Sequence, residues 1–137
     1  MKIEINELQK MYDTAGIDKD RLYKALLEWG NKGINGGKYK KEWSVDNPTK
    51  NYCYVVSEMV YNYFKTEGAI PMIVKVDGYD ITHRYLLYPN NQIVDLTAEQ
   101  FTDYEKVDYS KGKKCNFLPT PNGISLRAQK LYELYTK

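Results

Sequence analysis

Hydrophobic residues follow a helical spacing in some segments of the chain and an alternating spacing in others. Leu22, Ala25, Leu26 and Trp29 recur at positions i, i+3, i+4 and i+7, which predicts a helix with one apolar face. The helices predicted in this way cover residues 7–15, a segment from Asp18 or Asp20 to Trp29, and residues 52–66, 98–102 and 125–134. The residues predicted to cap them are Asn6, Thr97 paired with Gln100, and Ser125.

Three other segments have the composition and length of strands, namely residues 71–76, 81–88 and 92–95. Asp77–Gly78 is a turn signal between the first two, and a turn containing Asn90–Asn91 joins the second to the third. Strands joined by short turns must be antiparallel. The expected fold is therefore α+β, with helices packed on one side of a small antiparallel sheet.

The length of 137 residues fits a single domain over residues 1–137, with an ordinary balance of 42% hydrophobic and 28% charged residues. No apolar segment approaches the roughly 18–20 residues that a membrane span needs, and residues 1–10 lack the apolar stretch of a secretory signal. We therefore expect a cytoplasmic protein that does not bind the membrane. The net charge of +2 argues against a nucleic-acid partner. The two basic clusters lie in Gly-containing loops and comprise Lys38, Lys40 and Lys41, and Lys111, Lys113 and Lys114.

Candidate chemistry begins at Cys53, where a long loop rich in Gly and Asn (residues 33–51) becomes a helix. A helix N-terminus lowers the pKa of a thiol, and its free N–H groups can stabilise an oxyanion. The simpler interpretation is a small core residue, as cysteines on helices usually are. Two cysteines and one histidine do not form a zinc signature, so no metal or cofactor is expected.

A thiol nucleophile needs a base, and His83 is the only histidine. Its ring needs an acceptor, for which Asp95 on the next strand is the candidate. After a two-residue turn, Leu86 would face Asp95 and the carboxylate would point away from His83. After a three-residue turn, Tyr85 would face Asp95, and His83 and Asp95 would lie about 7–8 Å apart on one face. The thiol hypothesis therefore predicts a turn with an odd number of residues.

Several short segments also carry a family resemblance. They are Trp43-Ser44, Asn47-Pro48-Thr49, residues 51–58 (NYCYVVSE), 82–86 (THRYL), 93–101 (IVDLTAEQF) and 115–118 (CNFL), and Arg127-Ala128-Gln129. With them the chain resembles small bacterial and phage proteins of the YunG-like kind over about residues 42–135. Those proteins resemble the papain-like thiol fold, including its NlpC-like and transglutaminase-like forms. Residues 1–32 would then be variable N-terminal helices.

The resemblance implies a triad in which Cys53 is the nucleophile, His83 the general base and acid, and Asp95 the residue that orients His83. An amide shortly before the cysteine often contributes to the oxyanion hole, and Asn47, then Asn51, are the candidates. The two residues expected to contact the substrate are Tyr54 and Tyr85. Tyr52 and Arg84 depart from the family pattern, and Arg84 is interpreted as a solvent-exposed side chain.

Three functions remain open, of which nucleic-acid contact through the two lysine-containing loops is the least favoured. The first is a thiol-dependent hydrolase or acyltransferase that acts on an amide, isopeptide or thioester in a protein or peptide-like substrate. The alternative is a catalytically silent phage or bacterial protein that binds or inhibits a host protein. Its interface would be the loop at residues 33–51 and a tyrosine-rich surface of Tyr39, Tyr52, Tyr54, Tyr61 and Tyr63. Cys115 is either a second redox thiol or, given its apolar neighbours, a packed structural cysteine.

Overall fold

The computed structural model describes residues 2–32, 47–50, 52–64, 67–76, 81–101, 103–104, 107–120 and 123–137. Within these residues four α-helices accompany one four-stranded antiparallel sheet, so the α+β prediction is confirmed. The helices are α1 (Ile5–Ala15), α2 (Lys19–Lys32), α3 (Cys53–Tyr63) and α4 (Leu126–Thr136). The strands are β1 (Ile70–Val76), β2 (Ile81–Tyr88), β3 (Gln92–Val94) and β4 (Lys113–Lys114), in the sheet order β3-β2-β1-β4. Trp43, Ser44, Tyr39 and the lysine cluster at Lys38–Lys41 lie outside the described residues.

The helix ends agree only in part with those predicted from the sequence. α1 begins before the predicted Asn6 cap, with Glu4 in the N-cap position and no side-chain capping bond, so that prediction was wrong. α3 ends at Tyr63, earlier than predicted, because Phe64 leaves helical backbone geometry. Ser125 caps α4 as predicted, since its hydroxyl accepts a hydrogen bond from the Ala128 N–H.

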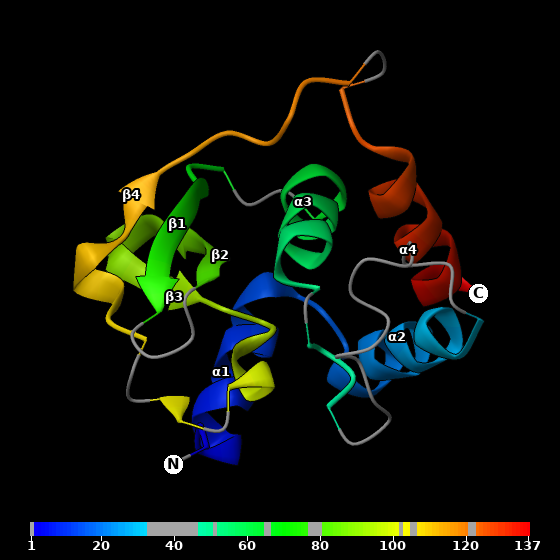
Figure 1. The fold of residues 1–137 in the computed structure, drawn as a ribbon, viewed down its shortest axis with the longest axis horizontal. Coiled ribbons are helices and arrows are strands. Elements are labelled where there is room, and N and C mark those ends of the chain that lie inside the picture. Colours follow the sequence, from blue (N-terminus) through cyan, green and yellow to red (C-terminus); the bar gives the residue numbers. More distant parts are fainter. Residues whose placement is uncertain are drawn as a thin grey trace.

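The sheet separates two hydrophobic clusters. Leu86, Tyr88 and Val94 face the helices and join their large core. Alternate strand residues point to opposite faces, so Tyr85 and its neighbours on β1 contribute to a second cluster with Phe101. Figure 1 shows the sheet on one side of the molecule, α3 next to it, and α4 and α2 farther away. One end of α3 therefore lies close to the sheet and the polar residues that the sheet carries.

Buried polar contacts fix the helices around this core. The Glu58 carboxylate on α3 accepts hydrogen bonds from the Ser125 N–H (2.8 Å) and hydroxyl (2.6 Å), which joins α3 to the start of α4. The Tyr12 hydroxyl on α1 donates to the Leu96 carbonyl at 2.7 Å, just beyond β3. α4 is thus bonded to α3, and α1 is bonded to the segment that follows β3, where the candidate site lies.

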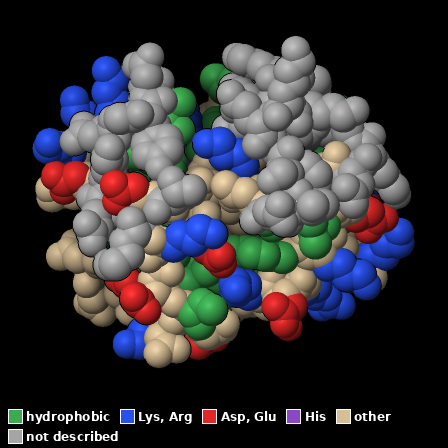
Figure 2. Space-filling view, turned by 60° about the horizontal axis from the view of Figure 1, so that its bottom comes forward, with side chains coloured by type: hydrophobic (Ala, Val, Ile, Leu, Met, Phe, Trp, Pro, Cys, Tyr) green, Lys and Arg blue, Asp and Glu red, His purple; other side chains and the backbone are tan. Residues whose placement is uncertain are grey.

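The surface is charged without a single dominant sign. On the face drawn in Figure 2, basic and acidic side chains are interspersed, with hydrophobic side chains visible between them. This mixture accords with the net charge of +2. No helix in the described part of the chain is long and apolar enough to cross a membrane.

Candidate functional site

The predicted site residues come from three adjacent elements. Cys53 is the first residue of α3, His83 lies in β2, and Asp95 follows directly after β3. Because α3 packs against β2, the beginning of the helix is brought to the hairpin that carries the other two residues.

The hairpin turn has three residues, Pro89–Asn91, as the thiol hypothesis predicted. Its two asparagines adopt positive φ angles of 65° and 59°, a conformation that asparagine tolerates better than most residues. β2 and β3 pair with Leu86 opposite Val94. The next pair in the same register is Tyr85 opposite Asp95. His83 and Asp95 therefore share one face of the hairpin.

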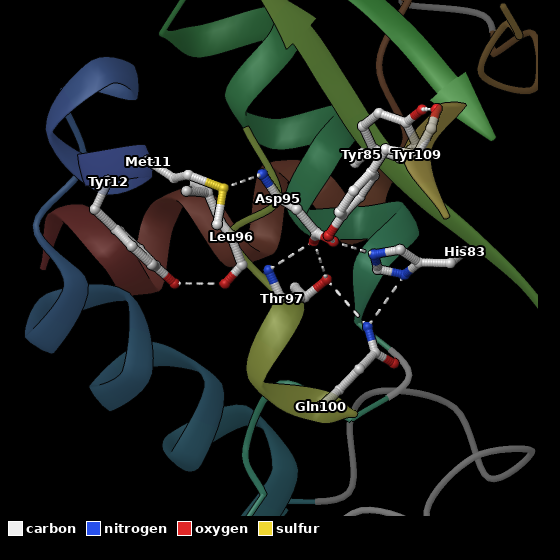
Figure 3. A network of polar contacts seen from close by, with 9 residues as sticks. All are labelled: Met11, Tyr12, His83, Tyr85, Asp95, Leu96, Thr97, Gln100 and Tyr109. Atoms are coloured by element: carbon white, nitrogen blue, oxygen red, sulfur yellow. Dashed lines mark hydrogen bonds and ion pairs between the residues drawn. The ribbon is translucent and has the colours of Figure 1, made fainter. Parts of the chain in front are cut away.

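His83 and Asp95 form a short, buried contact. The His83 Nε2 lies 2.6 Å from the Asp95 Oδ2, and neither side chain is exposed to solvent. Asp95 also accepts hydrogen bonds from the Tyr109 hydroxyl at 2.6 Å and from the Thr97 N–H at 3.3 Å (Figure 3). These bonds hold the carboxylate in place from several sides.

The imidazole ring is enclosed by aromatic and amide groups. Phe101 meets the ring edge-on with centroids 4.8 Å apart, and the Tyr85 ring lies nearly parallel to it with centroids 6.4 Å apart. Tyr85, predicted to contact the substrate, is buried, and its hydroxyl donates to the Tyr109 carbonyl. The Gln100 Nε2 lies 3.4 Å from the His83 Nδ1, the ring nitrogen that does not face Asp95 (Figure 3).

Cys53 is a partly exposed residue whose thiol interacts with the His83 side chain and with the backbone of Arg84. This backbone group is available because β3 ends at Val94, so the ladder between β2 and β3 does not extend to Arg84. Burial opposes ionisation of the thiol, but the hydrogen bond and positive charge of His83 outweigh it and lower the Cys53 pKa.

The same contacts act on His83 in the opposite direction. Burial disfavours the imidazolium, yet the charge of Asp95, its hydrogen bond and the contacts with Cys53 raise the His83 pKa to about 10. A lowered thiol pKa beside a raised imidazole pKa favours a thiolate–imidazolium pair near neutral pH.

Asn47, the first oxyanion candidate, is directed toward the same region. Its Nδ2 donates to the Gln100 carbonyl at 3.0 Å, which fixes the segment before α3 to the residue beside His83. The Asn47 Oδ1 is buried and has no hydrogen-bond partner among the described residues. Asn51, the second candidate, lies outside the described residues.

Tyr54, the residue after Cys53, packs against the segment at residues 117–118 and against Arg84. Its hydroxyl accepts a hydrogen bond from the Leu118 N–H at 2.6 Å, and its ring meets the Phe117 ring edge-on. The Arg84 guanidinium lies over the Tyr54 ring at 4.6 Å and donates to the Cys115 Sγ at 3.6 Å. Burial raises the Cys115 pKa, and the charge of Arg84 only partly offsets that effect.

Tyr109, Thr97 and Gln100 are site residues that the sequence analysis did not assign to the site. Thr97 and Gln100 were predicted as a helix-capping pair, but Thr97 makes no side-chain capping bond. Their side chains instead bond to each other at 3.1 Å, and both contact the His83–Asp95 pair. In the described part of the chain, no group of three His, Cys, Asp or Glu residues could hold a metal ion.

Residues 18–135 match the family model described as YunG protein. The chain belongs to the YunG family. The matched residues include α2 and all three of Cys53, His83 and Asp95, whereas α1 precedes them. The YunG match thus begins nearer the N-terminus than the resemblance at residues 42–135 suggested. No curated protein and no solved structure matches the chain.

Proposed function

We propose that this YunG-family protein is a thiol-dependent hydrolase or acyltransferase that acts on an amide, isopeptide or thioester of a protein or peptide-like substrate. The observation that carries the proposal is the continuous set of contacts from Cys53 through His83 to Asp95. A thiol at a helix N-terminus, an imidazole in contact with it and a carboxylate on the far ring nitrogen are the parts that thiol catalysis requires.

In the proposed reaction, the Cys53 thiolate attacks the substrate carbonyl carbon and forms a tetrahedral intermediate. The negative charge that develops on the carbonyl oxygen is stabilised by N–H groups in the first turn of α3. The His83 imidazolium then gives its proton to the departing amine or thiolate, leaving an acyl group on the Cys53 sulfur. Water or another nucleophile, deprotonated by His83, attacks this thioester and regenerates the thiolate.

Asp95 would orient His83 and stabilise its charged form, since its Oδ2 already lies 2.6 Å from the Nε2. Tyr109 would support that role by donating to the same carboxylate oxygen. A thiol on a helix, with His and Asp on neighbouring antiparallel strands, resembles the papain-like arrangement, and a distant relation to that fold is part of the proposal. Two unpaired cysteines also support a cytoplasmic, reducing location.

The decisive experiment is the pH dependence of Cys53 alkylation by iodoacetamide, measured in a Cys115→Ser background so that only Cys53 reacts. We expect a midpoint well below the ordinary thiol value of about 8.5. His83→Ala should move the midpoint upward, because it removes the hydrogen bond and positive charge that lower the Cys53 pKa.

A midpoint at or above the ordinary value, or no alkylation before unfolding, would overturn the enzymatic proposal. That result would favour the alternative of a catalytically silent binding or inhibitor protein. A stable adduct on Cys53 after treatment with an electrophilic acyl probe, detected by mass spectrometry and absent in Cys53→Ala, would support acyl transfer.

A further inference from the structure

Arg84 contacts the first turn of α3 in two ways. Its backbone hydrogen bonds to the Cys53 sulfur, and its guanidinium lies over the ring of Tyr54, the next residue of α3. Arg84 follows His83 in β2, so its side chain points to the sheet face opposite that of the imidazole. The cation therefore lies beside the residue that follows the candidate nucleophile in α3, without being part of the His83–Asp95 pair.

The guanidinium is held in a defined orientation while it remains partly exposed. Its NH1 group donates to the Asn116 carbonyl at 3.3 Å and to the Cys115 Sγ at 3.6 Å. Contact with the Tyr54 ring, together with these two acceptors, restrains the group. An arginine restrained in this way loses little rotamer freedom when it binds a ligand.

No carboxylate among the described residues pairs with the charge of Arg84. None of the ion pairs among the described residues involves Arg84, and its partners Tyr54, Asn116 and Cys115 are uncharged groups. Lys113 adds to the positive field, because Ile73 pairs with Arg84 on one side and with Lys113 on the other. Directly paired residues lie on the same face of a sheet, so both cations occur on the face near α3.

We propose that Arg84 is a specificity-determining residue that selects substrates carrying a carboxylate close to the carbonyl attacked by Cys53. The planar guanidinium suits two parallel hydrogen bonds to a carboxylate, which neither a neutral amide nor an apolar group can match. An acidic side chain or a chain-terminal carboxylate would provide the same chemistry. This inference rests on the proposed function, since it assigns a substrate class to the same site.

Two small alkylating reagents test the inference without knowledge of the substrate. Iodoacetate and iodoacetamide have similar size and react with the same thiolate, but only iodoacetate carries a carboxylate next to the reacting carbon. The ratio of their rates on Cys53, measured in the Cys115→Ser background at one pH, cancels the fraction of thiol that is ionised. The rate ratio therefore measures whether the surroundings of Cys53 attract or repel a negatively charged reagent.

We expect Arg84→Gln to lower the iodoacetate-to-iodoacetamide ratio by about fivefold, the effect of one partly exposed ion pair. Arg84→Lys should give an intermediate ratio, because it keeps the charge but loses the bidentate geometry. High salt should lower the ratio of the protein that retains Arg84, because ions screen the attraction. Lys130→Gln is the matched control, since it removes an equal charge from α4 and should leave the ratio unchanged.

An unchanged ratio in Arg84→Gln, or a ratio in the parent protein that does not respond to salt, would overturn the inference. The salt series and Arg84→Lys keep this test valid even if Arg84→Gln does not fold. Failure of both reagents to alkylate folded protein would instead overturn the proposed function, and the inference with it.

Discussion

A buried imidazolium is costly unless charged or polar groups surround it, and His83 illustrates how one residue can meet that condition. The Asp95 carboxylate bonds to its Nε2, and the Cys53 thiol provides a second acidic partner. Tyr109 and Thr97 bond to Asp95 in turn, so the carboxylate cannot easily rotate away from the ring. The protonation state of His83 is therefore the best single measure of whether this site is assembled.

Because the chain has one histidine, its ring protons can be followed by NMR without ambiguity of assignment. We expect the His83 titration midpoint to lie far above the ordinary value of about 6.5, toward about 10. Asp95→Asn should lower it, because that variant removes the negative charge from the Nε2 side. A wild-type midpoint at or below 6.5 would contradict the assigned ion pair.

The same shift predicts a pH dependence of stability. The pKa of His83 is higher in the folded than in the unfolded state, so protonated His83 stabilises the fold. This contribution is fully present below about pH 6.5 and is lost as the pH rises toward 10. Cys53 acts in the opposite sense, since its lowered pKa stabilises the fold above the ordinary thiol pKa. In Cys53→Ser, which isolates His83, the free energy of unfolding in urea should therefore fall as the pH rises above about 6.5. Adding Asp95→Asn to this variant should make the free energy of unfolding depend less on pH, because the charge that raises the His83 pKa is removed.

Cys53, His83 and Asp95 could be named as candidates from the sequence because thiols, imidazoles and suitably placed carboxylates are few in this chain. Tyr109 could not be predicted in the same way. It is one of 14 tyrosines, and it lies in a segment without periodicity that only the tertiary fold brings to Asp95. Whether a given tyrosine contacts a carboxylate depends on long-range packing that hydrophobic patterns do not encode.

At the scale of elements, the β2–β3 hairpin determines which side chains meet. A strand alternates its side chains between two faces, so the number of residues in the turn decides whether Asp95 points toward His83 or away from it. The observed three-residue turn, Pro89–Asn91, gives the first arrangement. The short β3 has a further effect, because its end at Val94 leaves the Arg84 backbone available to Cys53.

Elements that form by local pattern were predicted better than those that depend on distant partners. The predicted strand at residues 81–88 coincides with β2, since its composition and its flanking turns are local signals. The two-residue β4 was missed, because Lys113–Lys114 becomes a strand only by pairing with β1. The side-chain bond between Thr97 and Gln100 was likewise mistaken for a helix cap, since both arrangements require the same residue types at the same spacing.

At the scale of the whole molecule, α1 supports the site although it precedes the residues that match the family. The Tyr12 hydroxyl donates to the Leu96 carbonyl, and the Met11 sulfur lies 3.2 Å from the Asp95 backbone nitrogen (Figure 3). Both contacts involve the segment that places the carboxylate. The N-terminal helix thus stabilises the position of Asp95 from the side opposite His83.

Tyr12→Phe tests how much this support contributes. The substitution keeps the buried ring but leaves the Leu96 carbonyl without its hydroxyl donor, which should lower the free energy of unfolding by about 1–3 kcal/mol. Urea unfolding measures the loss. Tyr61→Phe is the matched control, because the Tyr61 side chain is 37% exposed and its variant should change the unfolding free energy by less than about 0.5 kcal/mol. Equal losses of unfolding free energy in the two variants would show that the hydrogen bond from Tyr12 to Leu96 does not stabilise the fold.

The separation of the site residues along the chain has a consequence for biosynthesis. His83 and Asp95 are 12 positions apart on one hairpin, and short hairpins close within microseconds. Cys53 meets them only after α3 has docked onto the completed sheet. A nascent or partly unfolded chain therefore carries Cys53 as an ordinary, mostly protonated thiol. The thiolate proposed for Cys53 would therefore exist only in the finished protein, which would limit unwanted chemistry on neighbouring molecules while the chain is being made.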